Sequence, residues 1–350
     1  MATIRDVAKA STVSIATVSR VFNDSALVSE DTRARVVEVA QRLGYWPNGI
    51  ARSLITNRTH TLGALLPDLH GEFFSEVIHG IDIASRERGF HLIVSRTSSS
   101  AQELTSALRS MRGRVDGLLV MAPDLDSESL KALTGNVPAV LLNPEARIPG
   151  VRAVTIANRE GAVEVVRHLH ELGHRRIATI CGPARNVDAQ QRLEGWRDAM
   201  RALQLEPSPE LVFRGDFTEH SGYEAAKRLL EAEPRPTAVF VANDYMAVGA
   251  LGAFQDAGLS VPGDLGIAGF DDIPLARYLT PPLTTVRVDM LGLGQRAVHL
   301  LLEPPAENGD EEGRLERLPT TLVVRSSCGV AWPDAEGLTR WNRGLGESGR

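Results

Sequence analysis

The chain has few cysteines and no long apolar run, and both features limit the classes of protein to which it can belong. Cys181 and Cys328 are its two cysteines among 350 residues, too few for the disulfide framework of a small exported protein. No stretch approaches the roughly 18 uninterrupted apolar residues of a membrane-spanning helix. The first ten residues contain Arg5, Asp6 and Lys9 instead of an apolar signal core. We therefore expect a cytoplasmic protein with no membrane partner.

The common catalytic and cofactor motifs are also missing. No serine stands in a G-x-S-x-G motif, no phosphate-binding loop occurs, and the nine histidines lack metal-ligand spacing. Gly292 and Gly294 begin a G-x-G-x-x-A pattern. However, no acidic residue ends a second strand about twenty positions later, where the ribose of a dinucleotide would need it. The sequence therefore predicts no enzyme, no cofactor and no metal site.

The chain is long enough for two or three domains. Its charge is distributed unevenly along the sequence. The overall net charge of −6 argues against nucleic acid as a partner. Residues 1–60, however, hold eight Arg and Lys against five Asp and Glu, a net charge of +3, which leaves −9 for residues 61–350. A basic N-terminal segment on an acidic body suits phosphate contacts made by that segment alone.

The first 45 residues have the pattern of three short helices. Thr3 and Asp6 are spaced to cap a first helix reciprocally. Ser14 can cap a second helix over 15–22, and a third extends from Ser29 to a terminal glycine at residue 44. Helix, tight turn, helix and a bracing helix form the helix-turn-helix arrangement, in which the second helix enters the major groove of DNA.

From residue 61 onward, short apolar runs alternate with amphipathic segments. Strands are predicted over 61–67, 90–95, 117–121, 139–142, 153–156, 176–180, 211–213, 238–242, 265–268 and 318–324. Helices are predicted over 74–88, 104–112, 161–172, 190–203, 222–231 and 245–257. Repeated strand–helix units imply parallel sheets with ligands at the carboxyl ends of the strands. The acidic, proline-containing segment 303–316 is predicted to be a solvated loop.

Longer motifs occur in order along the chain. They include T-I-R-D-V-A-K, V-S-I-A-T-V-S-R, V-S-E-D-T-R, L-G-Y-W-P-N, L-G-H-R-R-I-A, R-L-E-G-W, A-N-D-Y-M-A-V-G-A-L, P-P-L-T-T-V and L-P-T-T-L-V-V-R. In these motifs the chain resembles the LacI family of bacterial transcriptional regulators from Ala2 to Cys328. The resemblance implies a small all-α helix-turn-helix domain and an α/β body of two parallel-sheet subdomains, like the periplasmic sugar-binding proteins.

The implied domains follow the changes in pattern. The headpiece covers residues 1–46, a hinge helix and linker 47–60, an effector-binding and dimerisation body 61–330, and a flexible tail 331–350. Within the body, the first subdomain takes 61–157 and 287–325, and the second takes 158–286. The chain is therefore expected to return to the first subdomain near residues 286–302.

The resemblance also implies which residues contact DNA. The base-reading positions are Ile15, Ala16 and Arg20: a guanidinium can form two parallel bonds with guanine, and apolar side chains can contact thymine methyls. A place in the headpiece core is the alternative for Ile15. The implied contacts with the DNA backbone are Ser14, Thr17, Asn23, Thr32 and Tyr45.

Arg52 and Leu54 belong to the hinge, where the family leucine wedges into a central base step of the operator from the minor groove. A C-G step costs the least energy to bend. One departure is Thr12, which stands in a turn where the family usually has Gly or Asn.

A sugar site needs planar polar groups for vicinal hydroxyls and an aromatic face for the ring. The residues matching family effector positions are Asp68, Phe73, Phe74, Asn143, Asp188, Arg192, Phe217, Asn243 and Asp271. For Asn243 the alternative role is that of a helix cap. For the two adjacent phenylalanines the alternative is a place in the hydrophobic core.

Together these features predict a homodimeric, sequence-specific repressor that binds a pseudo-palindromic operator in double-stranded DNA. A small sugar in the cleft of the body is expected to control its affinity for the operator allosterically. A nucleobase acting as co-repressor on the same fold is one alternative. A plain sugar-binding receptor is an alternative of another class, disfavoured by the headpiece.

Overall fold

The computed structural model describes residues 2–22, 27–45, 58–69, 71–96, 101–121, 137–144, 147–304 and 313–329. The chain divides into two compact units, one built on the residues up to His60 and one on the residues from Thr61 onward. The predictions for Asn23, for Arg52 and Leu54 of the hinge, and for the tail 331–350 lie outside the described residues.

Three helices make up the N-terminal unit: α1 (Ile4–Ala10), α2 (Ile15–Phe22) and α3 (Glu30–Arg42). The predicted capping box is present, because Thr3 N donates to Asp6 Oδ2 at 2.8 Å and Asp6 N to Thr3 Oγ1 at 3.4 Å. The three helices share one apolar core, formed by Val7, Ala8, Val18, Val21, Val36, Val39 and Ala40. The apolar spacing within each helix therefore becomes a single packed interior.

The turn between α1 and α2 has an unusual backbone. Thr12 takes a φ of 54°, in the left-handed region that a β-branched residue adopts only at a cost. Ser11 supports the turn by donating its hydroxyl to Val7 O at 2.6 Å. At the other end of the unit, Gly44 takes a φ of 62° just past α3, as expected for a glycine that ends a helix.

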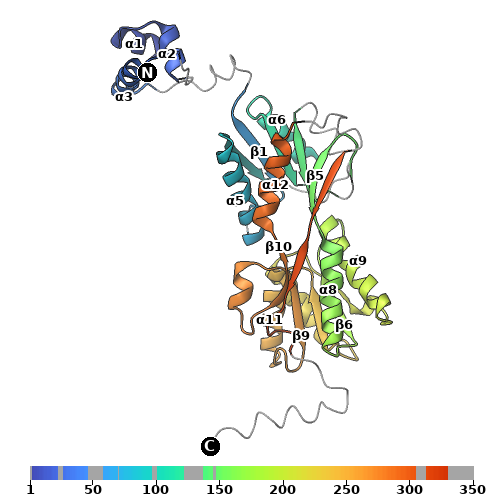
Figure 1. Ribbon diagram of the computed structural model, residues 1–350. Coiled ribbons are helices and arrows are strands. Elements are labelled where there is room, and N and C mark those ends of the chain that lie inside the picture. The colour runs from blue at the N-terminus through green and yellow to red at the C-terminus, as the bar shows by residue number, and fades with distance from the viewer. Residues whose placement is uncertain are drawn as a thin grey trace, which may run out of the picture. The chain divides into compact units, whose positions relative to one another are not determined.

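Two sheets organise the second unit, and both are drawn in Figure 1. The first has, in spatial order, β11 (Arg314–Leu318), β5 (Arg152–Ile156), β4 (Ala139–Leu142), β3 (Gly117–Met121), β1 (Thr61–Leu66) and β2 (His91–Arg96). The second has β12 (Thr320–Val323), β10 (Thr284–Val288), β9 (Gly266–Asp271), β8 (Ala238–Val241), β6 (Ile177–Cys181) and β7 (Val212–Arg214). All the described pairings are parallel except that of β10 with β12. We call the halves built on these sheets the first and second subdomains.

Helices cover the sheets as repeated strand–helix units require. The first subdomain has α5 (Glu72–Glu87), α6 (Ala101–Met111) and α12 (Met290–Leu302); the second has α8 (Asn158–Glu171), α9 (Val187–Ala202), α10 (Glu219–Leu230), α11 (Asp244–Asp256) and the short 3-10 helices η1 (Pro209–Leu211) and η2 (Pro274–Tyr278). In the second subdomain α8 packs on α9 and α10 on α11, and in the first α12 packs on α5.

The last part of the body departs from the sequence-based prediction. One late strand was expected over 318–324, but Pro319 separates β11 of the first sheet from β12 of the second. The prediction of a loop over 303–316 is wrong at its C-terminal end, because β11 begins at Arg314. The second sheet also includes β10 as far as Val288. The predicted boundary between the subdomains, at residues 286–287, therefore falls inside a strand of the second sheet.

Between its subdomains the described chain crosses three times, after β5, after β10 and after β11. Figure 1 shows β10 and the red strand pair β11–β12 running through this middle region. Three parallel connections favour hinge-like motion of one subdomain relative to the other.

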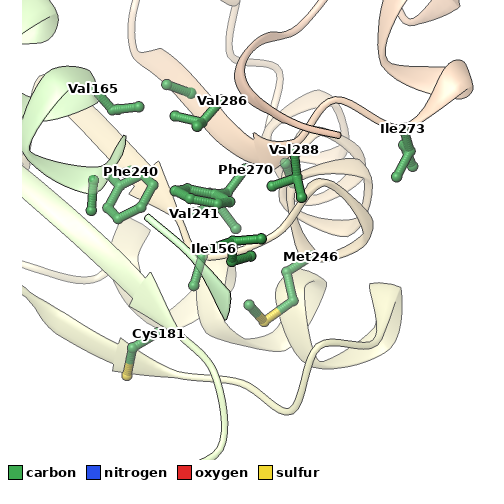
Figure 2. Close-up of a cluster of buried hydrophobic side chains, with 14 of the residues drawn as sticks. Ile156, Val165, Cys181, Phe240, Val241, Met246, Phe270, Ile273, Val286 and Val288 are labelled. Atoms are coloured by element: carbon green, nitrogen blue, oxygen red, sulfur yellow. The ribbon is translucent and has the colours of Figure 1, made fainter. Parts of the chain in front are cut away.

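Large aromatic side chains fill the core of the second subdomain. Phe240 of β8 and Phe270 of β9 are fully buried with ring centroids 6.4 Å apart. Figure 2 shows them with Val286 and Val288 of β10 and Met246 of α11. Each such buried ring stabilises the fold by about 2–3 kcal/mol, so the ends of β8 and β9 are held firmly.

Gly294 has a packing role in α12. A Cβ on this residue would lie 2.2 Å from Val77 O of α5, so only glycine allows the two helices to approach this closely. This explains part of the G-x-G-x-x-A pattern without a dinucleotide. Among the described residues no helix is both long and apolar enough to cross a bilayer.

Candidate functional site: an exposed helix face and a cavity between the subdomains

One face of α2 is exposed in the N-terminal unit. Ile15 is 46% exposed, and Ala16 and Arg20 are exposed as well, whereas Val18 and Val21 are buried. The core alternative for Ile15 is therefore wrong. Within the described residues, the side chain of Arg20 makes no hydrogen bond or ion pair, so its guanidinium is available to a ligand from outside.

The predicted backbone-contact residues surround that helix and also support its frame. Ser14 Oγ accepts from Thr17 N at 3.1 Å, which caps α2. Ser29 Oγ donates to Thr32 Oγ1 at 3.0 Å at the start of α3. The ring of Tyr45 packs on Phe22 at 5.8 Å between centroids, and partial burial raises its pKa. Contact of these residues with phosphates stays a prediction.

A cavity of about 400 Å³ lies between the two subdomains. The first subdomain lines it with Pro67, Asp68, Gly71, Phe73, Phe74 and Met121, and the second with Asn186, Asp188, Arg192, Asp216, Phe217, Thr218, Glu219, Asn243, Tyr245 and Asp271. Eight of the nine effector residues predicted from the sequence are brought together here. Asn143 is not among the lining residues; it lies behind them, as described below.

Arg192 of α9 is held by protein groups on several sides. Its Nε donates to Asn158 Oδ1 at 2.8 Å and its Nη1 to Ala242 O at 2.5 Å. The same Nη1 lies 3.0 Å from Asp271 Oδ1, and the guanidinium stacks 3.9 Å from the centroid of Phe270. With 3% exposure and these partners, Arg192 is held in one orientation at the wall of the cavity.

Asp271 ends β9 and is 5% exposed. Burial raises the pKa of its carboxyl to about 6; Arg192 opposes the shift, and Asp188 adds to it. A carboxyl that is this buried and this close to a guanidinium can accept a ligand hydroxyl without reorganising.

Asp188, in the first turn of α9, joins the two subdomains. Its Oδ1 accepts from Asn158 Nδ2 at 2.7 Å, and its Oδ2 accepts from Asn143 Nδ2 at 3.2 Å. Asn143 follows β4 of the first subdomain and is buried, with a φ of 51°. The asparagine thus supports a lining carboxylate across the cleft instead of facing the cavity itself.

Asn243 acts as a helix cap, the alternative expected from its position. Its Oδ1 accepts from Met246 N and its Nδ2 donates to Phe217 O, each at 3.0 Å. Because both ends of the amide are engaged, Asn243 positions α11 and the loop that carries Phe217. Its side chain lines the cavity mainly as part of this frame.

The turn after β9 has a strained backbone at two consecutive residues. Asp271 has a φ of 112° and Asp272 a φ of 55°. The buried Asp244 holds this turn by accepting from Ile273 N at 3.0 Å and from Thr285 Oγ1 at 2.6 Å. Burial, together with the nearby Asp271, raises the pKa of Asp244 well above its usual value. Strain maintained in this way is typical of ligand sites.

Aromatic rings enter the cavity from both subdomains. Phe73 and Phe74 open α5 in a T-shaped pair with centroids 5.3 Å apart. From the opposite side comes Phe217, whose φ is 74° and whose ring fits closely over Gly182: a Cβ there would lie 2.5 Å from its Cζ. A flat ligand or a sugar ring can therefore meet apolar faces from both sides.

Several lining residues were missed from the sequence. Asp216, Thr218 and Glu219 follow β7, so the rule that ligands bind at the carboxyl ends of strands would have found them. Tyr245 stands inside the first turn of α11, where the pattern indicates a helix face and nothing more.

Comparisons with known proteins bear on this site. Residues 3–48 match the family of bacterial regulatory proteins named after lacI, and residues 166–328 match the periplasmic binding protein-like domain. The HTH-type transcriptional repressor PurR of Haemophilus influenzae (strain PittEE) is 36% identical over 334 residues, which cover 93% of this chain and 98% of the relative. The chain belongs to the LacI family.

Solved structures agree with this assignment over nearly the whole chain. The lac repressor dimer bound to operator and the anti-inducer ONPF has a TM-score of 0.85 at 32% identity, covering 94% of this chain and 99% of that one. The transcriptional regulator CelR in complex with cellobiose has a TM-score of 0.70 at 32% identity, covering 93% and 100%. This LacI-family chain is a DNA-binding transcriptional repressor and not an enzyme.

Proposed function

We propose that this LacI-family repressor binds its operator as a homodimer and that an uncharged, hydroxyl-rich molecule, a small sugar, controls the binding from the cavity. The observation that carries this proposal is the imbalance of polar groups around the cavity. Among the residues that the structure describes, the lining holds the carboxylates of Asp68, Asp188, Asp216, Glu219 and Asp271 and a single cationic side chain, that of Arg192.

This lining is rich in hydrogen-bond acceptors and poor in donors. The described hydrogen bonds of Arg192 go to Asn158 and Ala242, and its charge is paired with Asp271. A ligand must therefore supply most of the donors, as the hydroxyls of a sugar do. A phosphate or carboxylate on the ligand would meet several like charges at short range, which disfavours sugar phosphates and nucleotides.

A nucleobase is the second candidate, and the curated relatives favour it. Several of the similar relatives are named PurR, a name that supports the nucleobase alternative better than the sugar. Phe74 and Phe217 line the cavity from opposite subdomains, and aromatic rings favour stacking with a planar base. The similarity to CelR, whose structure was solved in complex with cellobiose, supports the sugar.

Control of DNA binding requires that the effector favour one arrangement of the subdomains over another. The cavity is formed by both subdomains, so a ligand that contacts both changes the free energy of cleft closure. In a homodimer such closure would alter the spacing of the two headpieces and thus their fit to two half-sites. Arg20 would read a guanine in each half-site, and Leu54 would wedge into the central step.

Thermal-shift titration of the full chain tests the effector. The panel holds neutral mono- and disaccharides, the phosphate esters of the same sugars, and purine and pyrimidine bases. We expect at least one neutral sugar to raise the melting temperature and its phosphate ester to have no effect. Stabilisation by a base with no response to any sugar would establish the second candidate instead.

A further inference from the structure

Tyr245 makes a hydrogen bond across the cleft between the two subdomains. It belongs to the first turn of α11 in the second subdomain. Its hydroxyl accepts from Glu72 N at 2.8 Å, and Glu72 is the first residue of α5 in the first subdomain. The bond therefore joins the two walls of the cavity directly.

The ring of Tyr245 fits against a position that only glycine satisfies. Gly71, just before α5, has a φ of 87°, and a Cβ on it would lie 3.1 Å from Tyr245 Cε2. A second, longer bond holds the same end of α5, because Leu275 N of η2 donates to Glu72 Oε2 at 3.4 Å. The start of α5 is thus clamped by two elements of the opposite subdomain.

This end of α5 needs an outside partner. The first N–H groups of a helix have no acceptor within the helix, and here Tyr245 supplies one for Glu72. The next two residues, Phe73 and Phe74, line the cavity. Whatever fixes the first turn of α5 therefore also fixes the aromatic wall that faces a ligand.

We propose that Tyr245 is a positioning residue that stabilises the closed arrangement of the cleft, with Phe73 and Phe74 in place. The proposal rests on the proposed function only in taking the cavity as the effector site. Asn143 Nδ2 of the first subdomain also donates to Asp188 Oδ2 of the second, so a second hydrogen bond bridges the cleft. Opening of the cleft would be the step that Tyr245 resists.

The test compares Tyr245→Phe with Tyr223→Phe in the full chain without ligand. Tyr223 is a matched control, since its hydroxyl donates to Asp256 Oδ2 at 2.8 Å within the second subdomain and away from the cleft. Hydrogen exchange of residues 71–76 should accelerate roughly two- to tenfold in Tyr245→Phe, the range for one hydrogen bond. It should stay at the wild-type rate in Tyr223→Phe. Small-angle scattering should show a larger radius of gyration for Tyr245→Phe alone.

Gly71→Ala approaches the same contact from the other side, because its methyl group would lie 3.1 Å from Tyr245 Cε2 and push the ring away by a few tenths of an ångström, while the hydroxyl stays in the chain. It should reproduce the faster exchange and the larger radius. Wild-type exchange and dimensions in both Tyr245→Phe and Gly71→Ala would overturn the proposal, as would an equal acceleration in Tyr223→Phe. No sugar or base is present in these measurements. They can therefore overturn the role of Tyr245 without affecting the proposed effector, and the ligand titration can overturn the proposed effector without affecting the role of Tyr245.

Discussion

Arg192 and Asp271 form an ion pair at 3.0 Å in which the side chains are only 4% and 7% exposed. Burial at this level makes the partners depend on each other, because either charge alone would be left without water or a counter-ion. The pair also ties α9 to the end of β9. It therefore serves the stability of the second subdomain as well as the chemistry of the cavity.

Removing the cation alone should be costly. Arg192→Met leaves Asp271 as an unpaired buried carboxyl, and we expect it to lower the free energy of unfolding by about 3–5 kcal/mol. Adding Asp271→Asn should restore part of that loss, since the double variant buries no charge at this site. Urea unfolding of the full chain at neutral pH measures both; equal stability of the single and double variants would contradict the dependence.

The raised pKa of Asp271 predicts a pH effect of definite sign. Its pKa is about 6 in the folded chain against an ordinary value of 3.8, so the folded state holds this proton more tightly. Its contribution to stability is fully present below pH 3.8 and is lost as the pH rises through 6. The free energy of unfolding of wild type, relative to Asp271→Asn, should fall by up to about 3 kcal/mol between pH 4 and 7. A flat difference over that range would refute the assignment.

Base recognition by Arg20 can be separated from general attraction to DNA. Arg20→Ala should cost about 1–3 kcal/mol in operator binding and relax the preference at one position of each half-site. Arg35→Ala, which removes an exposed arginine from α3, should leave the preference profile unchanged. Selection from a random DNA library measures the profiles of both variants, and an unaltered profile for Arg20→Ala would exclude the role.

The turn of the headpiece should respond to a change in backbone freedom. Thr12 has a φ of 54°, so Thr12→Gly should stabilise the N-terminal unit by about 1 kcal/mol. Gly44→Ala is the opposite case: a Cβ there has nothing within 4 Å, but φ is 62°, so its cost of about 1 kcal/mol would be purely conformational. Calorimetry of the full chain should show the headpiece transition moving in opposite directions in the two variants.

Much of the fold was predictable because apolar periodicity and burial coincide. Strand β3, Gly117–Met121, is buried at every position and reads as a continuous apolar run. Strand β11 gives the opposite result. Its Arg314 and Glu316 form a network of ion pairs with Arg296 and Glu303, and such a polar edge strand has the composition of a solvated loop.

The lining of the cavity was predictable where residues follow strands or match the family's effector positions. Asp271 and Asp188 occur in positions that topology brings to one sheet edge, and their types suit a polar ligand. Tyr245 was not predictable, because its partner Glu72 N is 173 residues away in the chain. Contacts of that kind depend on how closely two subdomains meet, which no local pattern encodes.

Neither subdomain of the body is a contiguous piece of sequence. The first sheet takes β11, and the second takes β12, from the same short segment beyond α12. A headpiece can therefore be exchanged between relatives with a single junction near His60, whereas exchanging the second subdomain needs junctions at all three crossings. New operator specificities can thus be recombined far more easily than new halves of the effector cavity.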